Sequence, residues 1–229
     1  MPMPVSIIIP TFNEGQSIKA TLKTLQLFRL YGGEVIVADG GSTDNTREEC
    51  HLLVDYWLDA DKSRARQMNA GAEVANRKVL LFLHADTVLP NNFIHLLRVY
   101  AESYAAWGRF DIRLSGDRKI FRIIEFMMNW RSRLTGIATG DQAIFVTEKT
   151  FHKVGGFPDQ PLMEDIELSK KLKKLAKPFC IGEPLTTDSR RWEKNGVWRT
   201  IFLMWSLRLR YFFGESSKSI APKYNNQDE

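Results

Sequence analysis

The stretch "VLLFLHADTVLP", residues 79 to 90, begins as a run of apolar residues that ends at His84 and Asp86. A short apolar run that ends in polar residues is typical of a strand buried on both faces of a parallel sheet. Two similar runs precede it, "VSIII" at 5 to 9 and "EVIVA" at 34 to 38. Together the three runs predict parallel strands in the first half of the chain.

Apolar residues recur at helical spacing between these runs. They are Ile18, Leu22, Leu25 and Phe28 in the first interval and Ala65, Met68, Ala72 and Ala75 in the second. Asn13 and Gln16 are placed to cap the first helix. The alternation predicts an α/β fold with a mostly parallel central sheet, flanked by helices and joined by right-handed crossovers.

The composition limits the class of protein. With 229 residues and 44% apolar content, the chain is long enough for one main domain. Cys50 and Cys180 lie far apart without CxxC spacing, which is typical of small buried side chains in a reducing compartment. The start lacks the basic segment of a signal peptide, and no apolar run reaches the roughly 18 residues of a transmembrane helix. We expect a cytoplasmic protein.

The segments after the three strands are all polar: "PTFNEG", "DGGSTDNT" and "HADTVLP". In open α/β sheets, ligands bind beyond the carboxyl ends of the strands. Neither GxGxxG nor GxxxxGK followed by Ser or Thr is present, which argues against a dehydrogenase or an ATPase. Asp39 can accept hydrogen bonds from a base or ribose, or serve as a turn residue. Arg64, Arg66 and Gln67 begin a helix and suit a phosphate, or form a solvated basic face.

Asp86 is a candidate metal ligand. Mg²⁺ and Mn²⁺ prefer one or two carboxylates together with phosphate oxygens. His84, two residues earlier on the same side of an extended chain, is a candidate second ligand, and imidazole suits Mn²⁺ better than Mg²⁺. A capping aspartate beside a packed histidine is the alternative.

Several of these segments occur in an order typical of one family. They are "PTFNE", "DGGSTDNT", "HADT" as a variant of DxD, "GGF" followed by "MEDIELSKKL", and "RRW". Over roughly residues 3 to 195 the sequence resembles family 2 glycosyltransferases of the GT-A fold. "LHAD" and "GDQAIFV" resemble a bacterial subgroup, the radical-SAM/selenodomain-associated transferase 2 proteins. The resemblance implies a metal-dependent inverting enzyme that moves one sugar from a nucleoside-diphosphate sugar, by default a UDP-sugar, to an acceptor hydroxyl.

The resemblance also implies roles for individual residues. Asp86 is the metal-binding carboxylate, Asp165 is the catalytic base, and Arg190, Arg191 and Trp192 contact the diphosphate. The nucleotide site comprises Pro10, Thr11, Asn13, Glu14, Asp39, Arg64, Gln67 and Ala85. Two positions depart from the family pattern: His84 replaces the first aspartate of DxD, and Asp188 replaces the glutamine of QxxRW.

The helix periodicity supports the assignment of Asp165 independently. Leu168, Leu172 and Leu175 mark a helix face, so Glu164 and Asp165 fall in the first turn, where the helix dipole favours an ionised carboxylate. An ionised carboxylate is what deprotonation of an acceptor hydroxyl requires. The sugar or acceptor site is expected to include Glu164 and the "TGDQA" segment, unless that segment is a plain turn. Within the "TGDQA" segment, the residues expected at this site are Gly140, Asp141 and Gln142.

The C-terminal part departs from the α/β pattern. We expect a GT-A-like domain over 1 to 195, and a helical extension with a loose tail over 196 to 229. Segments 119 to 134 and 196 to 214 are rich in aromatic residues and arginine. They are expected to pack on the core or a second copy, or to contact the inner face of an anionic membrane that presents a lipid-linked acceptor. The net charge of +5 is mild, and no nucleic-acid partner is expected.

Two other classes of function remain open from sequence. A sugar-phosphate nucleotidyltransferase uses a related sheet and metal carboxylates, but it normally has a Gly-rich phosphate loop after its first strand, where this chain has "PTFNEG". A non-catalytic nucleotide-sugar binder is the second alternative, because the altered DxD could have lost useful metal binding.

Overall fold

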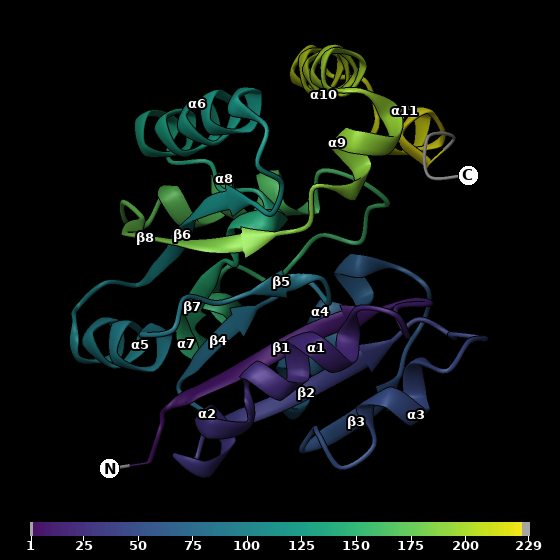
Figure 1. Ribbon diagram of the computed structural model, residues 1–229. Helices are drawn as coiled ribbons and strands as arrows, with labels where there is room; N and C mark the ends of the chain where they lie inside the picture. Colours follow the sequence, from purple (N-terminus) through teal and green to yellow (C-terminus); the bar gives the residue numbers. More distant parts are fainter. Residues whose placement is uncertain (1, 226–229) are drawn as a thin grey trace.

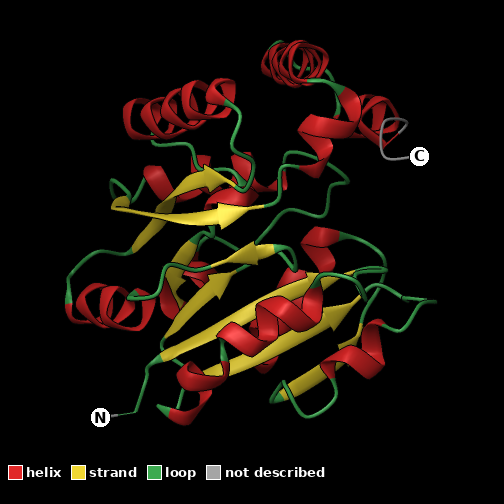
Figure 2. Ribbon diagram, viewed as in Figure 1, coloured by secondary structure: helices red, strands yellow, loops and turns green. Residues whose placement is uncertain are grey.

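The computed structural model describes residues 2 to 225, and within them eight strands form one sheet in the order β3-β2-β1-β4-β7-β6-β8-β5 (Figures 1 and 2). The strands are β1 Val5–Thr11, β2 Glu34–Asp39, β3 Tyr56–Asp59, β4 Val79–Phe82, β5 Thr87–Val88, β6 Trp107–Leu114, β7 Phe145–Thr147 and β8 Phe179–Thr187. The first four in the order, β3, β2, β1 and β4, are mutually parallel. The three predicted strands are therefore confirmed.

The second half makes the sheet mixed. β7 runs antiparallel to both β4 and β6, β8 runs parallel to β6, and β5 pairs antiparallel with β8. All residues of β1, β2 and β4 are buried, as expected for strands covered on both faces. The predicted α/β class with a largely parallel sheet flanked by helices is confirmed.

Helices cover both faces of the sheet because successive strand residues point to opposite sides. Ile7 and Ile9 pack in one apolar layer with residues of α1, α2 and α5, whereas Ile8 packs in the other with residues of α4, α7 and α8. The helices are α1 Ile18–Thr24, α2 Gln26–Leu30, α3 Thr46–Cys50, α4 Arg64–Val74, α5 Phe93–Glu102, α6 Lys119–Thr135, α7 Glu148–Lys153, α8 Glu164–Lys173, α9 Arg190–Asn195, α10 Val197–Phe212 and α11 Ser217–Asn225, with a 3₁₀ turn, η1, at Gly140–Gln142.

The first predicted helix differs from the structure in two respects. It is split at Leu25 into α1 and α2, although its four apolar residues are all buried as expected. The predicted capping by Asn13 and Gln16 is wrong. Ser17 occupies the N-cap without a side-chain cap bond, and Asn13 has a positive φ of 55° and accepts a hydrogen bond from the Thr43 amide at 2.9 Å.

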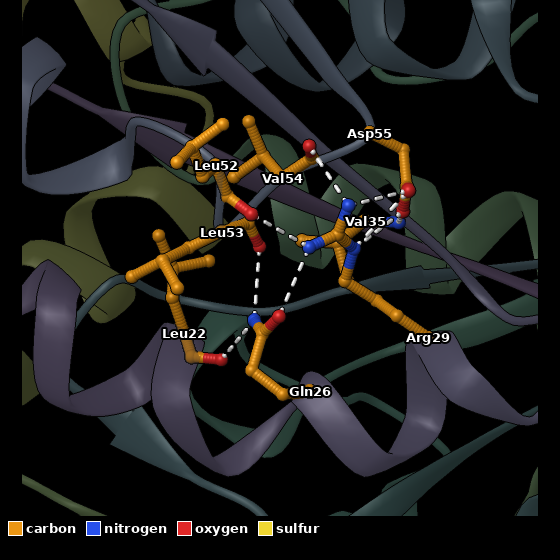
Figure 3. A network of polar contacts seen from close by, with 8 residues as sticks. All are labelled: Leu22, Gln26, Arg29, Val35, Leu52, Leu53, Val54 and Asp55. Carbon is orange, nitrogen blue, oxygen red and sulfur yellow. Dashed lines mark hydrogen bonds and ion pairs between the residues drawn. The ribbon is translucent and has the colours of Figure 1, made fainter.

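A polar network fixes α2 against the segment that leads into β3 (Figure 3). The Arg29 guanidinium donates to both carboxylate oxygens of Asp55 and to the carbonyl oxygens of Leu52 and Val54. Asp55 in turn accepts from the Val35 amide at 2.8 Å. Val35 and Asp55 lie at the amino ends of β2 and β3, so this network is at the end of the sheet opposite the carboxyl ends of these strands.

The helices α6, α9, α10 and α11 lie above β6 and β8 in Figure 1. The tail expected to be loose is helical from Ser217 to Asn225, and Ile220 and Ala221 in it are buried. Residues 226 to 229 lie outside the described part of the chain. Within residues 2 to 225, no helix combines the length and apolar character needed to cross a membrane.

Candidate active site

The loops after β1 and β2 are joined around Asp39. Its carboxylate accepts hydrogen bonds from the Thr11 hydroxyl, the Gly41 amide, and both the amide and the hydroxyl of Ser42. A carboxylate has about four lone-pair positions, and these protein donors use that capacity. The turn role considered from sequence is therefore realised, and a bond from Asp39 to a base requires one of these donors to give way.

Gln67 and Ala85 also hold the strand ends together. The Gln67 side-chain amide donates to the carbonyl oxygens of Thr11 at 2.6 Å and Ala38 at 2.8 Å. The Ala85 carbonyl accepts from the Thr21 hydroxyl at 2.7 Å, and its methyl group lies in the core. Both residues therefore bond or pack within the protein, and they support the loops of the predicted nucleotide site.

Arg64 is the positive charge at the centre of the site. It sits at the first position of α4 and remains exposed to solvent. Its charge acts on Glu14 after β1, on His84 and Asp86 after β4, and on Glu164 and Asp165 at the start of α8. Five predicted site residues from three separate segments thus converge on one arginine. By contrast, the neighbouring Arg66 forms ion pairs with Asp61 and Asp159.

Asp165 is held against η1. Its carboxylate accepts the Gly140 amide at 2.8 Å and the Ile166 amide at 2.7 Å. Burial raises the pKa of Asp165, although these two amides and the Arg208 charge act in the opposite direction. Each oxygen keeps a second lone pair, so the carboxylate can still accept a proton from a substrate hydroxyl.

His84 packs on the same turn. A Cβ on Gly140 would lie 2.7 Å from His84 Nε2, so only glycine permits this close approach. Burial and the Arg64 charge lower the pKa of His84 to about 4, which keeps the imidazole neutral at physiological pH. The Thr87 amide donates to the His84 carbonyl at 3.2 Å, so the chain turns here and is not extended. The extended-chain argument for placing His84 and Asp86 on one side is therefore wrong.

The remaining residues of the "TGDQA" segment form the turn itself. Thr139 and Gln142 cap η1 reciprocally, and the Thr139 hydroxyl donates to Asp141. Gln142 is fully buried, and its Nε2 has no hydrogen-bond partner in the part of the chain that the structure describes.

Asp86 faces a second carboxylate that sequence reasoning did not assign to the metal. β5 and β8 pair Thr87 with Thr187, so Asp86 and Asp188, the next residues outward, lie opposite each other. Burial, together with the Asp188 charge, raises the pKa of Asp86. Like charges directly opposite in an antiparallel pair are destabilising, and a divalent cation would relieve that repulsion.

This donor set fits a divalent metal that also uses phosphate oxygens. No group of three or more His, Cys, Asp or Glu side chains within residues 2 to 225 could hold a metal ion by itself. Mg²⁺ and Mn²⁺ are commonly bound by one or two carboxylates plus substrate phosphates, and Asp86 and Asp188 supply the two carboxylates. The side chains of the chain therefore suit a metal that arrives with the nucleotide.

The three residues predicted to contact the diphosphate lie in different surroundings. Arg190 forms an ion pair with Asp188 at 2.5 Å, and its charge opposes the rise in pKa that burial causes at Glu14 and Asp86, so it lies near both carboxylates. Trp192 instead packs partly buried against an apolar cluster of β6, α6 and α10. Arg191 belongs to α9, but its side chain lies outside the described part of the structure.

Burial also affects Glu164, which is only 7% exposed. Burial and the adjacent Asp165 carboxylate raise the pKa of Glu164 from 4.5 to about 7. The folded state therefore holds this proton more tightly than the unfolded chain does. The resulting stabilisation is complete below pH 4.5 and is lost as the pH rises towards about 7.

Glu164→Gln is expected to raise the melting temperature at about pH 8 by about 2–4 °C, the shift that about 1 kcal/mol produces in a chain of this size. At about pH 4 the gain should vanish, because the wild-type carboxyl is then protonated. Thermal melts of the variant at the two pH values test this. The exposed Glu102→Gln serves as the control and should show no pH-dependent gain. A Glu164→Gln protein that melts lower than the wild type at both pH values contradicts the prediction.

Comparison with known proteins assigns the family. A family model described as "Glycosyl transferase family 2" matches residues 6–157, which is more than half of the chain. The chain belongs to glycosyl transferase family 2. The match contains the loops after β1, β2 and β4 and the η1 turn, whereas α8 and α9 lie beyond it. Membership argues against the sugar-phosphate nucleotidyltransferase alternative.

Among curated relatives of this family-2 chain, validoxylamine A glucosyltransferase from Streptomyces hygroscopicus subsp. jinggangensis (strain 5008) is 38% identical over 99 residues, covering 39% of this chain and 24% of the relative. A PGL/p-HBAD biosynthesis glycosyltransferase of Mycobacterium bovis (strain BCG / Pasteur 1173P2) is 33% identical over 91 residues, covering 37% of this chain and 36% of the relative. The matched segment therefore spans only about a quarter to a third of these relatives.

Solved structures show the same fold. S. aureus TarS 1-349 in complex with UDP-GlcNAc superposes with a TM-score of 0.66 at 17% identity, covering 82% of this chain and 58% of that one. A mannosyltransferase from Pyrobaculum calidifontis in complex with GDP-Man and Mn²⁺ gives a TM-score of 0.60 at 20% identity, covering 82% and 57%. At these identities the similarity establishes the GT-A architecture and nothing finer.

Proposed function

We propose that this family-2 chain is a metal-dependent inverting glycosyltransferase that moves one sugar from a nucleoside-diphosphate sugar to an acceptor hydroxyl. The observation that carries the proposal is that the loops after the paired strands β1 and β4 carry Glu14 and Asp86, while the Gly140 amide holds Asp165 at the start of α8, and the Arg64 charge acts on all three carboxylates. This arrangement combines a base with a cationic site for a diphosphate. It also argues against a binder that has lost its catalytic groups.

Asp165 acts as the general base. Its position at the start of α8 and its bond to the Gly140 amide fix the carboxylate beside the predicted sugar site. Burial raises its pKa, which makes the ionised form a stronger base towards a hydroxyl. The acceptor oxygen attacks the anomeric carbon on the face opposite the leaving group, so the configuration inverts without a covalent enzyme intermediate.

The leaving diphosphate is stabilised by positive charge. The charges of Arg64 and Arg190 both act on Asp86, and guanidinium groups bind phosphate oxygens in a bidentate manner. Asp86 and Asp188 would hold Mn²⁺ or Mg²⁺. When bound, the metal neutralises the negative charge that develops on the departing diphosphate. The presence of both Mn²⁺ and GDP-Man in the complex of one structural neighbour supports this assignment.

Incubation with a panel of nucleoside-diphosphate sugars, with detection of the released nucleoside diphosphate, tests the proposal. One donor should be consumed in the presence of Mn²⁺ or Mg²⁺ and not in EDTA. Proton NMR of the product should show the anomeric configuration opposite to that of the donor. Release that is independent of metal, or a product that retains the configuration, contradicts the corresponding part of the mechanism.

The finer assignments follow the same reasoning. UDP is the preferred nucleotide by the resemblance of the motifs, and UDP-GlcNAc in a structural neighbour supports it. The "LHAD" and "GDQAIFV" segments support the radical-SAM/selenodomain-associated subgroup. Asp188 in place of the glutamine of QxxRW supports transfer of a single sugar over processive synthesis. The free Cys50 and Cys180 suit a reducing, cytoplasmic location.

The exposed face of α6 and α10 is proposed to contact an anionic membrane that presents the acceptor. This membrane face comprises Ile123, Phe126, Met127, Trp130 and Leu134 of α6, and Trp198, Phe202, Trp205, Leu209 and Phe212 of α10, all at least 48% exposed. α10 carries three arginines and no acidic residue. Aromatic side chains beside arginines are typical of helices that lie at the surface of an anionic bilayer. A second copy of the chain is the alternative occupant.

Trp130→Ala combined with Trp205→Ala is expected to reduce sedimentation with phosphatidylcholine–phosphatidylglycerol vesicles by about tenfold or more, because each tryptophan buries a large apolar area. Tyr31→Ala combined with Tyr104→Ala, both exposed and away from this face, should leave sedimentation unchanged. Equal sedimentation of all three proteins contradicts the membrane assignment. A wild-type protein that forms dimers and does not bind vesicles contradicts it as well.

A further inference from the structure

Arg131, in the last part of α6, has donors without partners. Its Nε and Nη2 are shielded from solvent and have no hydrogen-bond partner among the described residues. Among the described residues, the Arg131 guanidinium donates one hydrogen bond, a long one of 3.5 Å from Nη1 to the Ile137 carbonyl. An unsatisfied buried donor on a charged group costs free energy, so this guanidinium is poised for a ligand that accepts hydrogen bonds.

Arg208, on α10, is in the same condition. Its Nε is buried and has no partner within the described part of the chain. The side chain as a whole is only partly buried, as is that of Arg131, so each of the two residues keeps some surface open to solvent. The two residues come from separate helices, and the apolar cluster that holds Leu207 and Ile137 brings them near enough for their charges to repel each other.

Packing explains why they meet beside the catalytic base. Leu207, which precedes Arg208, is buried in one apolar cluster with Met163 and Ile166, the residues on either side of the Glu164–Asp165 pair. Ile137, which accepts the Arg131 bond, packs against the same cluster. The cluster therefore brings α6, α10 and the start of α8 to one point.

The charge balance at this point is incomplete. Burial and the Arg208 charge lower the pKa of Arg131 to about 10, while Asp141 and Asp165 only partly compensate. Arg109, which is fully buried nearby, also acts on Arg131, although Asp111 forms an ion pair with it. Asp165 must itself lose negative charge when it takes a proton from the acceptor. An anion bound between the two helices would therefore relieve repulsion that the protein does not relieve itself.

We propose that Arg131 and Arg208 form a phosphate-binding site for the acceptor, so that the sugar is transferred to a hydroxyl of a phosphate-bearing molecule. The inference rests on the proposed function, because it names the acceptor class for the base Asp165. The donor diphosphate is assigned to two other cations, Arg64 and Arg190, whose charges act on Asp86. Guanidinium groups match the geometry of phosphate oxygens, and both carry free donors.

The test is a calorimetric titration with inorganic phosphate and with glycerol 3-phosphate, in the presence of saturating UDP and Mn²⁺ so that the donor site is filled. Arg131→Gln combined with Arg208→Gln should weaken phosphate binding about tenfold or more, because two charge-assisted hydrogen-bonding groups are lost. Lys119→Gln combined with Arg199→Gln is the matched control. It removes the same charge from exposed positions of the same two helices and should bind like the wild type.

Three results would overturn the proposal: a wild type that binds no phosphate, a double variant that binds it like the wild type, or a double variant that loses UDP affinity instead. If the double variant does not fold, each single glutamine variant is measured and should weaken binding several-fold. If the wild-type protein does not bind UDP, this result contradicts the proposed function. In that case the same titration without nucleotide still decides whether the arginines bind phosphate.

Vesicles distinguish the source of the phosphate. If the acceptor is a lipid, the arginine variant should lose binding to phosphatidic acid vesicles and keep its binding to phosphatidylglycerol, whose phosphate is a diester. If the acceptor is a soluble phosphate monoester, the loss should appear only with glycerol 3-phosphate. Equal binding of variant and wild type to every one of these ligands contradicts a phosphate site between the helices.

Discussion

Asp165→Asn is expected to slow sugar transfer about 10²- to 10⁴-fold while the affinity for the nucleoside diphosphate stays nearly unchanged. Asparagine has almost the shape of aspartate and can still accept the Gly140 amide, but it cannot take a proton from the acceptor hydroxyl. Because the Asp165 carboxylate bonds the Gly140 and Ile166 amides and is not one of the carboxylates assigned to the metal, donor binding is expected to depend on it little. Initial rates and a nucleotide titration on the same preparation measure both quantities.

Glu167→Gln provides the control for this substitution. Glu167 lies on the same helix, and its carboxylate bonds Lys170 and Tyr211 instead of η1. Its loss should leave the rate within a few-fold of the wild type. If Asp165→Asn weakens nucleotide binding as much as it slows transfer, Asp165 is part of the donor site and its assignment as the base is wrong.

Asp86→Asn is expected to weaken Mn²⁺-dependent binding of the nucleoside diphosphate by at least about 100-fold. Loss of a residue that only orients a metal ligand already costs about 10- to 100-fold, and Asp86 is proposed to be a ligand itself. Asp188→Asn should have the same direction of effect because the two carboxylates lie opposite each other. Titrations in Mn²⁺ and in EDTA measure how much of the affinity depends on the metal.

The control is Asp117→Asn, which removes an exposed carboxylate on the loop before α6. It should bind the nucleotide like the wild type in both buffers. The assignment fails if Asp86→Asn retains the full difference between Mn²⁺ and EDTA. If Asp86→Asn loses this difference and Asp188→Asn retains it, Asp86 remains assigned as a metal ligand and Asp188 does not.

The first half of the fold could be predicted from sequence because its signals are local. Each buried strand is an uninterrupted apolar run, and each tip carries the polar residues that a ligand site requires. The helix start at Glu164 is equally local, since the acidic pair directly precedes the periodic leucines. The break at Leu25 was missed because α1 and α2 share one apolar face and no proline or glycine marks the boundary.

Residues whose role depends on pairing between distant segments could not be predicted. Asp188 meets Asp86 through the register of β5 on β8, which no local pattern encodes. Arg131 and Arg208 looked like part of a basic aromatic surface, and only the packing of Leu207 beside Met163 turns them towards the base. Their one sequence signal was an arginine on an otherwise apolar helix segment, which equally describes a solvated residue.

Some predicted site residues proved to have structural partners. The Gln67 side-chain amide donates to the carbonyl oxygens of Thr11 and Ala38, and the Asp39 carboxylate oxygens accept hydrogen bonds from protein donors. Sequence motifs mark such positions because the shape of the site depends on them. They do not reveal whether a side chain faces the ligand or supports the loop that does.

The central claim is that the strand tips around Arg64 and Asp86 form a metal-dependent site for a nucleoside diphosphate. Calorimetric titration of the wild-type protein with UDP, GDP, CDP, TDP and ADP, each in Mn²⁺, Mg²⁺ and EDTA, tests it most directly. We predict that one nucleotide, UDP by preference, binds at least about tenfold more tightly with a divalent metal than in EDTA. No binding of any nucleotide in any buffer, or binding of equal strength in EDTA, would contradict the account.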